Sequence, residues 1–304
     1  MRGAVAGALP NLIVIGAMKA GTSALHYYLD LHPEVSMSSL KELDFFVDGR
    51  IAEGDAWRFG EDDLRIEHAL DANWSRGVAW YSRHFRADAP VRGEASPSYT
   101  APWYPDVAER MAALVPDARL IFLVRDPVAR AVSNYSHQRT LGRDRRSIEE
   151  AFADERSPYV ARSRYALVIE PFLRRFDSSQ LLVLSCEELL ERRRDTVGAA
   201  YRFAGVDQSF WSEKAESERY RGEAKAARGP VAQLIARSPA RALARRLPDA
   251  VKSRGESALA ARHPPEVGVA SPALRARLAG FFGEDIERLV ELVGRDFPEW
   301  PAYG

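Results

Sequence analysis

A loop bounded by glycines follows an apolar run near residue 12, and its residues are typical of an anion-binding loop. The stretch IVIGAMKAGTSALHYYL turns from an apolar strand through small residues into the start of a helix. Such a turn directs backbone N–H groups and the positive end of the helix at a phosphate or sulfate. The nucleotide-triphosphate loop reads G-x-x-x-x-G-K-[ST], and here Thr22 takes the place of the lysine, which stands three residues earlier at Lys19. The predicted anion-binding residues are Gly16, Lys19, Ala20, Gly21, Thr22 and Ser23.

A second stretch, RLIFLVRDPVARAVSNY, predicts another anion-holding end. A buried strand carries Arg125 to the carboxyl edge of a parallel sheet, where open α/β folds bind ligands. Pro127 then begins a helix, and Ser133 lies two turns into it. Taken alone, the stretch also fits a strand-end ion pair followed by a surface serine. Together with the first loop, it indicates a nucleotide phosphorylated at both ends of its ribose.

The two stretches together resemble the donor-binding motifs of sulfotransferases, which use 3′-phosphoadenosine 5′-phosphosulfate (PAPS). The resemblance implies that the first loop holds the 5′-phosphosulfate and that Lys19 reaches the leaving phosphate and the transferring sulfuryl group. It implies that Arg125 and Ser133 hold the 3′-phosphate. A basic loop of the family covers this phosphate, which makes Arg228 a candidate, although the charge-rich stretch around it equally fits a solvated surface segment.

Three further motifs are similar to those of the heparan-sulfate type of sulfotransferase and its bacterial relatives. They are His32-Pro33, KELDFF at residues 41–46 and GEASPSY at residues 93–99. The glutamate of the second motif is the general base in that branch, which implies this role for Glu42. The alternative is a solvated carboxylate beside Lys41.

Two positions depart from the pattern of that branch. Asp44 stands where the family has a histidine, and Ala95 where it has a lysine. A carboxylate two residues from Glu42 on an extended segment points to the same side, and like charges raise the pKa of one of the two groups. The predicted acceptor-side residues are Lys41, Asp44, Glu94 and His137. We expect His26 to be a packed residue of the first helix.

The apolar pattern predicts the elements that position these residues. Short apolar runs predict buried strands of a parallel sheet at 12–15, 120–124 and 181–184, each followed by a turn and a helix-like segment. The fold class is therefore α/β, and the resemblance implies a P-loop-like three-layer fold with a central parallel sheet flanked by helices. Helices are predicted at 22–31, 107–114, 127–137, 148–153, 168–176 and 187–204, and from Pro272 to a stop at Gly294.

Composition bounds the remaining possibilities. The 304 residues are 46% apolar and carry a formal net charge of +0, which gives no overall attraction to nucleic acid or anionic membrane. We expect one sulfotransferase domain over 1–304, with a variable, partly mobile insertion rich in Arg, Ala and Pro at 214–268. Cys186 is the only cysteine, and no cluster has metal-ligand spacing, so neither a disulfide nor a metal is expected. These features, with no signal peptide or membrane segment recognised, predict a cytoplasmic bacterial protein.

The sequence therefore predicts transfer of a sulfuryl group from PAPS to a hydroxyl, or less favourably an amine, of a carbohydrate, lipid or secondary metabolite. We expect Glu42 to be the base and Lys19 to stabilise the leaving phosphate. Two rival functions stay open. One is a P-loop kinase that acts on a small molecule. The other is a nonenzymatic nucleotide- or carbohydrate-binding module on the same fold. No pattern indicates the oligomeric state.

Overall fold

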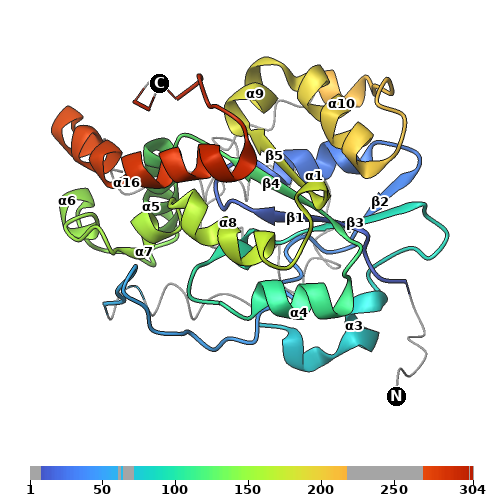
Figure 1. The fold of residues 1–304 in the computed structure, drawn as a ribbon, viewed down its shortest axis with the longest axis horizontal. Coiled ribbons are helices and arrows are strands. Elements are labelled where there is room, and N and C mark those ends of the chain that lie inside the picture. Colours follow the sequence, from blue (N-terminus) through green and yellow to red (C-terminus); the bar gives the residue numbers. More distant parts are fainter. Residues whose placement is uncertain (1–7, 61–62, 64–71, 218–269, 301, 304) are drawn as a thin grey trace, which may run out of the picture.

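A five-stranded parallel sheet runs through the middle of the protein, with helices on both of its faces (Figure 1). The computed structural model describes residues 8–60, 63, 72–217, 270–300 and 302–303. The strands lie in the order β2-β3-β1-β4-β5. They are β1 (Leu12–Gly16), β2 (Val35–Met37), β3 (Val91–Ala95), β4 (Arg119–Val124) and β5 (Leu181–Ser185).

The inner strands are apolar along their whole length because helices cover both faces of the sheet. Every residue of β1 is buried, and β4 is buried from Leu120 to Val124. In the register of the sheet, Leu12 of β1 lies opposite Gly93 of β3 and Arg119 of β4. The predicted fold class is confirmed by this arrangement.

The helices form two layers. Figure 1 shows α1, α9 and α10 on one side of the sheet and α4 and α8 on the other, with α16 running across α8 and α5. The described α-helices are α1 (Thr22–Asp30), α3 (Val78–Ser82), α4 (Val107–Leu114), α5 (Pro127–Thr140), α6 (Ile148–Ala151), α7 (Pro158–Ala161), α8 (Tyr165–Leu173), α9 (Cys186–Glu191), α10 (Arg193–Ala204), α11 (Lys214–Ser217) and α16 (Pro272–Val293). Short 3₁₀ turns are η1 (Trp74–Arg76), η2 (Pro97–Thr100) and η3 (Ser178–Gln180).

Most of the predicted elements are present, and the differences have local causes. The helix expected at 187–204 is two helices, because Arg192 leaves the helical conformation between α9 and α10. The helix expected at 168–176 lies at 165–173 instead. Strands β2 and β3 were not predicted: β2 has three residues, and β3 contains a glycine and a glutamate that favour strands poorly.

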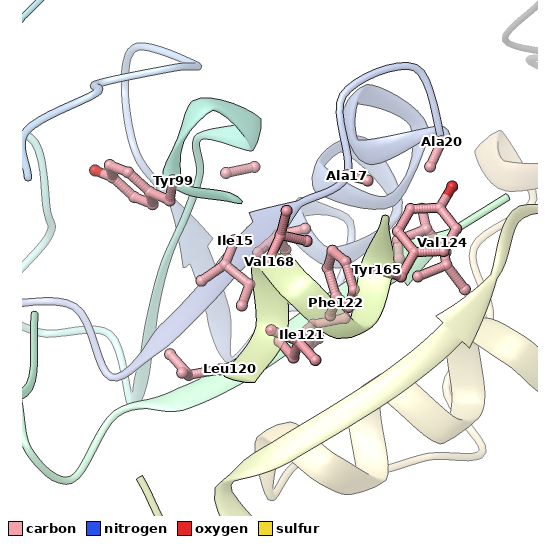
Figure 2. Close-up of a cluster of buried hydrophobic side chains, with 14 of the residues drawn as sticks. Ile15, Ala17, Ala20, Tyr99, Leu120, Ile121, Phe122, Val124, Tyr165 and Val168 are labelled. Carbon is pink, nitrogen blue, oxygen red and sulfur yellow. The ribbon is translucent and has the colours of Figure 1, made fainter. Parts of the chain in front are cut away.

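The core behind the sheet's carboxyl edge is built by β1, β4 and α8 (Figure 2). Tyr165 and Val168 of α8 lie over the strand residues Ile15 and Phe122, and the rings of Phe122 and Tyr165 meet edge-on with centroids 5.7 Å apart. All four side chains are buried. This packing fixes the ends of β1 and β4, from which the candidate site is built.

Helix α8 begins three residues earlier than predicted because α16 supplies an acceptor for its first turn. The buried carboxylate of Asp285 accepts hydrogen bonds from the backbone N–H groups of Ala166 at 3.0 Å and Leu167 at 3.2 Å. The first N–H groups of a helix have no partner within the helix, so an acidic side chain there satisfies them. A hydrophobic pattern alone does not reveal this tertiary cap.

We expect Asp285→Ala to destabilise the protein, because it leaves the two N–H groups without their acceptor. The expected loss is about 1–3 kcal/mol, which corresponds to a fall in Tm of roughly 2–4 °C per kcal/mol. Differential scanning fluorimetry measures this, with Glu284→Ala at an exposed position of the same helix as the control. A Tm equal to that of the control would show that the cap contributes nothing.

Candidate active site

The predicted site residues lie at or after the ends of four neighbouring strands. β1 leads into the glycine-bounded loop at 17–21, and β2 leads into the segment that contains Lys41 and Glu42. Glu94 is the last residue but one of β3, and β4 ends just before Arg125. Because all strands are parallel, these ends lie at one edge of the sheet, where open α/β folds bind ligands.

The glycine-bounded loop is held in a tight path between β1 and α1. The N–H of Ala17 donates to the carbonyl of Leu123 at 2.6 Å, which ties the loop to the end of β4. Lys19 has a φ of 72°, and Gly21 caps α1 with a φ of 97°. A Cβ at Gly16 would lie 2.3 Å from Oγ1 of Thr100, so only glycine fits there. The turn thus depends on glycines at the positions that the motif specifies.

Two arginines donate to carbonyl groups of this loop. Nη1 of Arg125 lies 3.4 Å from the carbonyl oxygen of Lys19, and Nη1 of Arg130 lies 3.3 Å from that of Met18. Arg130 is fully buried, and it also donates to the carbonyl of Tyr159 and to Oγ of Ser163, both at 2.5 Å. Burial lowers the pKa of Arg130 to about 10, which still leaves it charged at neutral pH.

Arg130 was not predicted from the sequence. It lies five residues after Arg125 in the stretch RDPVARAV, and its neighbours Val128 and Ala131 are also buried. An arginine on the buried face of a predicted helix is a signal that it has a specific partner, since charged residues are rarely buried unless they are paired. This burial pattern could have identified Arg130 from the sequence.

The end of β4 positions Arg125 through its main chain. The hydroxyl of Tyr165 donates to the carbonyl of Arg125 at 2.7 Å, and the N–H of Arg125 lies 3.3 Å from the same hydroxyl oxygen. The side chain of Asp126 accepts from the N–H of Ala129 at 2.7 Å and thereby caps α5. The half-buried Ser133 lies six residues after Pro127 on α5, about 9 Å along the helix axis.

The segment after β2 presents a carboxylate to solvent. The side chains of Glu42 and Lys41 form an ion pair, and 43% of the Glu42 side chain is exposed. The N–H of Glu42 donates to the carbonyl of Ala95 at 3.1 Å, which joins this segment to the end of β3. Glu42 also has a left-handed backbone, with a φ of 61°. Its carboxylate is accessible, as a base must be.

Asp44 points away from solvent, in contrast to Glu42. It is only 6% exposed, and its carboxylate accepts a hydrogen bond from the hydroxyl of Ser98. Its N–H donates to Oγ of Ser96 at 3.1 Å. The pKa of Asp44 is raised to about 7, mainly by burial; the hydrogen bond from Ser98 opposes this shift, and the neighbouring charges of Glu42 and Glu94 contribute to it. This placement favours coupling to Glu42 over the predicted contact with the acceptor.

Glu94 is fully buried at the end of β3. Its carboxylate accepts hydrogen bonds from the hydroxyls of Tyr81, Ser96 at 2.8 Å and Tyr99 at 2.9 Å. Burial raises its pKa to about 6, although all three hydrogen bonds oppose the shift. The hydroxyl of Tyr99 also accepts from the N–H of Phe45 at 3.0 Å, so Glu94 supports residues 38–46, the segment that carries the candidate base Glu42 and is called the base segment. The geometry does not favour the acceptor contact that we predicted for Glu94.

The structure says less about the remaining predicted residues. His137 lies half-buried on α5, one turn beyond Ser133. Arg228, together with residues 218–268 of the predicted insertion, lies outside the described residues. Within the described part of the chain, no group of three or more His, Cys, Asp or Glu side chains could hold a metal ion. None of the described helices is long and apolar enough to cross a membrane.

Comparisons with known proteins agree with this geometry. The model of the sulfotransferase family matches residues 10–213. The human bifunctional heparan sulfate N-deacetylase/N-sulfotransferase 2 is 27% identical over 263 residues, which cover 73% of this chain and 27% of the relative. Human heparan sulfate glucosamine 3-O-sulfotransferase 3B1 is 27% identical over 221 residues, which cover 68% of this chain and 50% of the relative. The chain thus spans about a quarter to a half of these curated relatives.

A solved structure covers nearly the whole chain. The sulfotransferase from Alicyclobacillus acidocaldarius superposes with a TM-score of 0.66 and 25% identity, over 97% of this chain and 99% of the other. The P-loop-like fold, the glycine-bounded loop and the family match over two-thirds of the sequence lead to one conclusion. The chain belongs to the sulfotransferase family.

Proposed function

We propose that this protein transfers a sulfuryl group from PAPS to a hydroxyl group of a carbohydrate, lipid or secondary metabolite, with Glu42 as the general base. One observation carries the proposal. The exposed carboxylate of Glu42 and the anion-binding loop follow strands of the same parallel sheet and therefore lie at the same edge. Family membership supports sulfuryl transfer over the rival phosphoryl transfer.

The residues of the site fit a donor with anionic groups at two positions. In this proposal, the loop N–H groups and Lys19 hold the 5′-phosphosulfate, because the loop joins a strand to the N-terminus of α1. Arg125 and Ser133 hold the 3′-phosphate. Arg125 suits this role because its main chain is fixed by Tyr165, while its half-buried guanidinium remains able to form further hydrogen bonds.

Sulfuryl transfer resembles phosphoryl transfer in its demands on the protein. The acceptor oxygen attacks sulfur in line as the bond between sulfur and the leaving phosphate oxygen breaks, so charge builds on the phosphate. Glu42 takes the proton of the acceptor hydroxyl, and Lys19 stabilises the leaving phosphate. The products are the sulfated acceptor and 3′-phosphoadenosine 5′-phosphate (PAP). A screen of hydroxyl acceptors with labelled PAPS, scored by mass spectrometry for an added sulfate, identifies the acceptor.

We expect Glu42→Gln to lower kcat by about 10²–10⁴-fold, since the amide cannot accept the proton. Calorimetric affinity for PAP should stay within about twofold of wild type, because Glu42 does not hold the donor. Glu191→Gln, at an exposed position at the end of α9, is the matched control. Full activity of Glu42→Gln would exclude Glu42 as the base.

A nucleotide titration tests the rival function. Tight binding of ATP with magnesium and no binding of PAP would support a kinase.

We expect Arg125→Met to lower the affinity for PAP by about 10–100-fold, because a charged hydrogen bond to the 3′-phosphate is lost. The affinity for AMP, which lacks that phosphate, should change by no more than about threefold. Isothermal titration of both nucleotides measures this, with Arg174→Met, at the exposed C-terminal cap of α8, as the control. If affinity for AMP falls equally, Arg125 acts through the carbonyl of Lys19 and not on the 3′-phosphate.

We expect Asp44→Asn to change the pH dependence of kcat. Burial raises the pKa of Asp44 to about 7, so its carboxyl is largely neutral at pH 6 and ionised at pH 8. An ionised Asp44 repels the charge of Glu42 and so makes Glu42 a stronger base. The wild-type rate should therefore rise between pH 6 and 8, and the asparagine variant should lack this rise. Identical profiles for the two proteins would show that Asp44 does not tune the base.

A further inference from the structure

His26 lies on α1, on the same face as Asp30, and Asp30 contacts the residues that lead into the base segment. Ser23, His26 and Asp30 are spaced i, i+3 and i+7, so they line one side of this helix. At the far end of this face, the carboxylate of Asp30 accepts from the N–H of Met37 at 2.9 Å. The chain then passes from Met37 to Lys41 and Glu42. It begins this path on the same side of α1 as His26.

The imidazole of His26 has an unsatisfied nitrogen. Its Nε2 atom is buried and has no hydrogen-bond partner. A buried polar atom without a partner is costly to the folded state. In native proteins such an atom calls for an explanation, and one explanation is a partner that arrives in another state of the site.

Two charges act on the imidazole of His26, those of Lys41 and Glu42. Burial is the main cause that lowers the pKa of His26 to about 4, so the ring is neutral at physiological pH. The cation of Lys41 lowers the pKa further, and the anion of Glu42 raises it, so both charges act on the imidazole. A neutral imidazole with the proton on Nδ1 has a free acceptor at Nε2. An ammonium group is a suitable donor for it.

The ion pair between Glu42 and Lys41 opposes catalysis. Their ion pair stabilises the ionised carboxylate and so weakens it as a base. To take the proton of an acceptor hydroxyl, Glu42 works best when the ammonium of Lys41 has moved off its carboxylate. The ammonium then needs another acceptor, because leaving a partly buried charge without a partner is costly.

We propose that His26 is a positioning residue that receives Lys41. The ammonium of Lys41 exchanges between the carboxylate of Glu42 and Nε2 of His26, and Glu42 is the stronger base when Lys41 is on His26. This inference rests on the proposed role of Glu42 and adds a residue that does not touch the reacting atoms.

The test is a double-mutant cycle between His26 and Lys41. His26→Leu, His26→Gln, Lys41→Met and the double variant His26→Leu/Lys41→Met are compared with wild type and with Glu42→Gln. The rate is the release of PAP from PAPS, measured in buffer, where water accepts the sulfuryl group, and with the acceptor found by the screen. Tm and calorimetric affinity for PAP report whether each variant keeps its fold and donor site.

We expect His26→Leu to lower kcat roughly tenfold or more with an unchanged KM for PAPS, because Lys41 stays on Glu42. His26→Gln, which keeps an acceptor oxygen, should recover most of that loss. In the Lys41→Met background, His26→Leu should change kcat by no more than about twofold, because the ammonium is gone. A packing role for His26 would lower kcat equally in both backgrounds.

Several outcomes would overturn the inference, and they differ from failure of the proposed function. If Glu42→Gln keeps the wild-type rate, the base assignment fails and the role of His26 falls with it. If Glu42→Gln is inactive and the loss from His26→Leu is the same with and without Lys41, only the role of His26 falls. A folded His26→Gln variant as slow as His26→Leu would also contradict it.

Discussion

The carbonyl groups of a loop that turns sharply between a strand and a helix need hydrogen-bond donors from elsewhere in the chain. Arg130 meets this constraint at the centre of the protein. Its buried guanidinium reaches the carbonyl of Met18 in the loop, and it also holds Tyr159 and Ser163. One cation therefore joins the loop, α5 and the α7–α8 connection, and the shape of the anion site depends on it.

A buried anion supports the base segment, whereas a buried cation supports the loop. Glu94 at the end of β3 accepts from the hydroxyls of Tyr81, Ser96 and Tyr99. The oxygens of Ser96 and Tyr99 in turn accept from the N–H groups of Asp44 and Phe45. The base segment contains no regular helix or strand, so its path is fixed by these side chains. A buried polar network is rigid only when all its members have partners, as they do around Glu94.

The sequence was most informative where a backbone geometry demands particular residues. The glycines of the loop and the apolar runs of β1, β4 and β5 follow from sterics and burial, so the sheet and the sharp turn of the loop could be predicted. The positions of Asp44 and Glu94 could not, because spacing along an extended segment does not tell which carboxylate a distant tyrosine or serine will reach. The partners of Arg130 could not be predicted either, because they lie 29 or more residues away in the chain, although its place on the buried face of a predicted helix could have marked the residue itself.

Three of the candidate site residues, Lys19, Glu42 and Asp44, have left-handed backbones, with φ values of 72°, 61° and 45°. Only glycine adopts this conformation freely, and each other residue there costs roughly 1–2 kcal/mol. Glycine at any of these positions would therefore relieve backbone strain while deleting the functional group. Selection for thermal stability alone would drive these positions toward glycine, so the roles proposed for their side chains would come at a cost in stability.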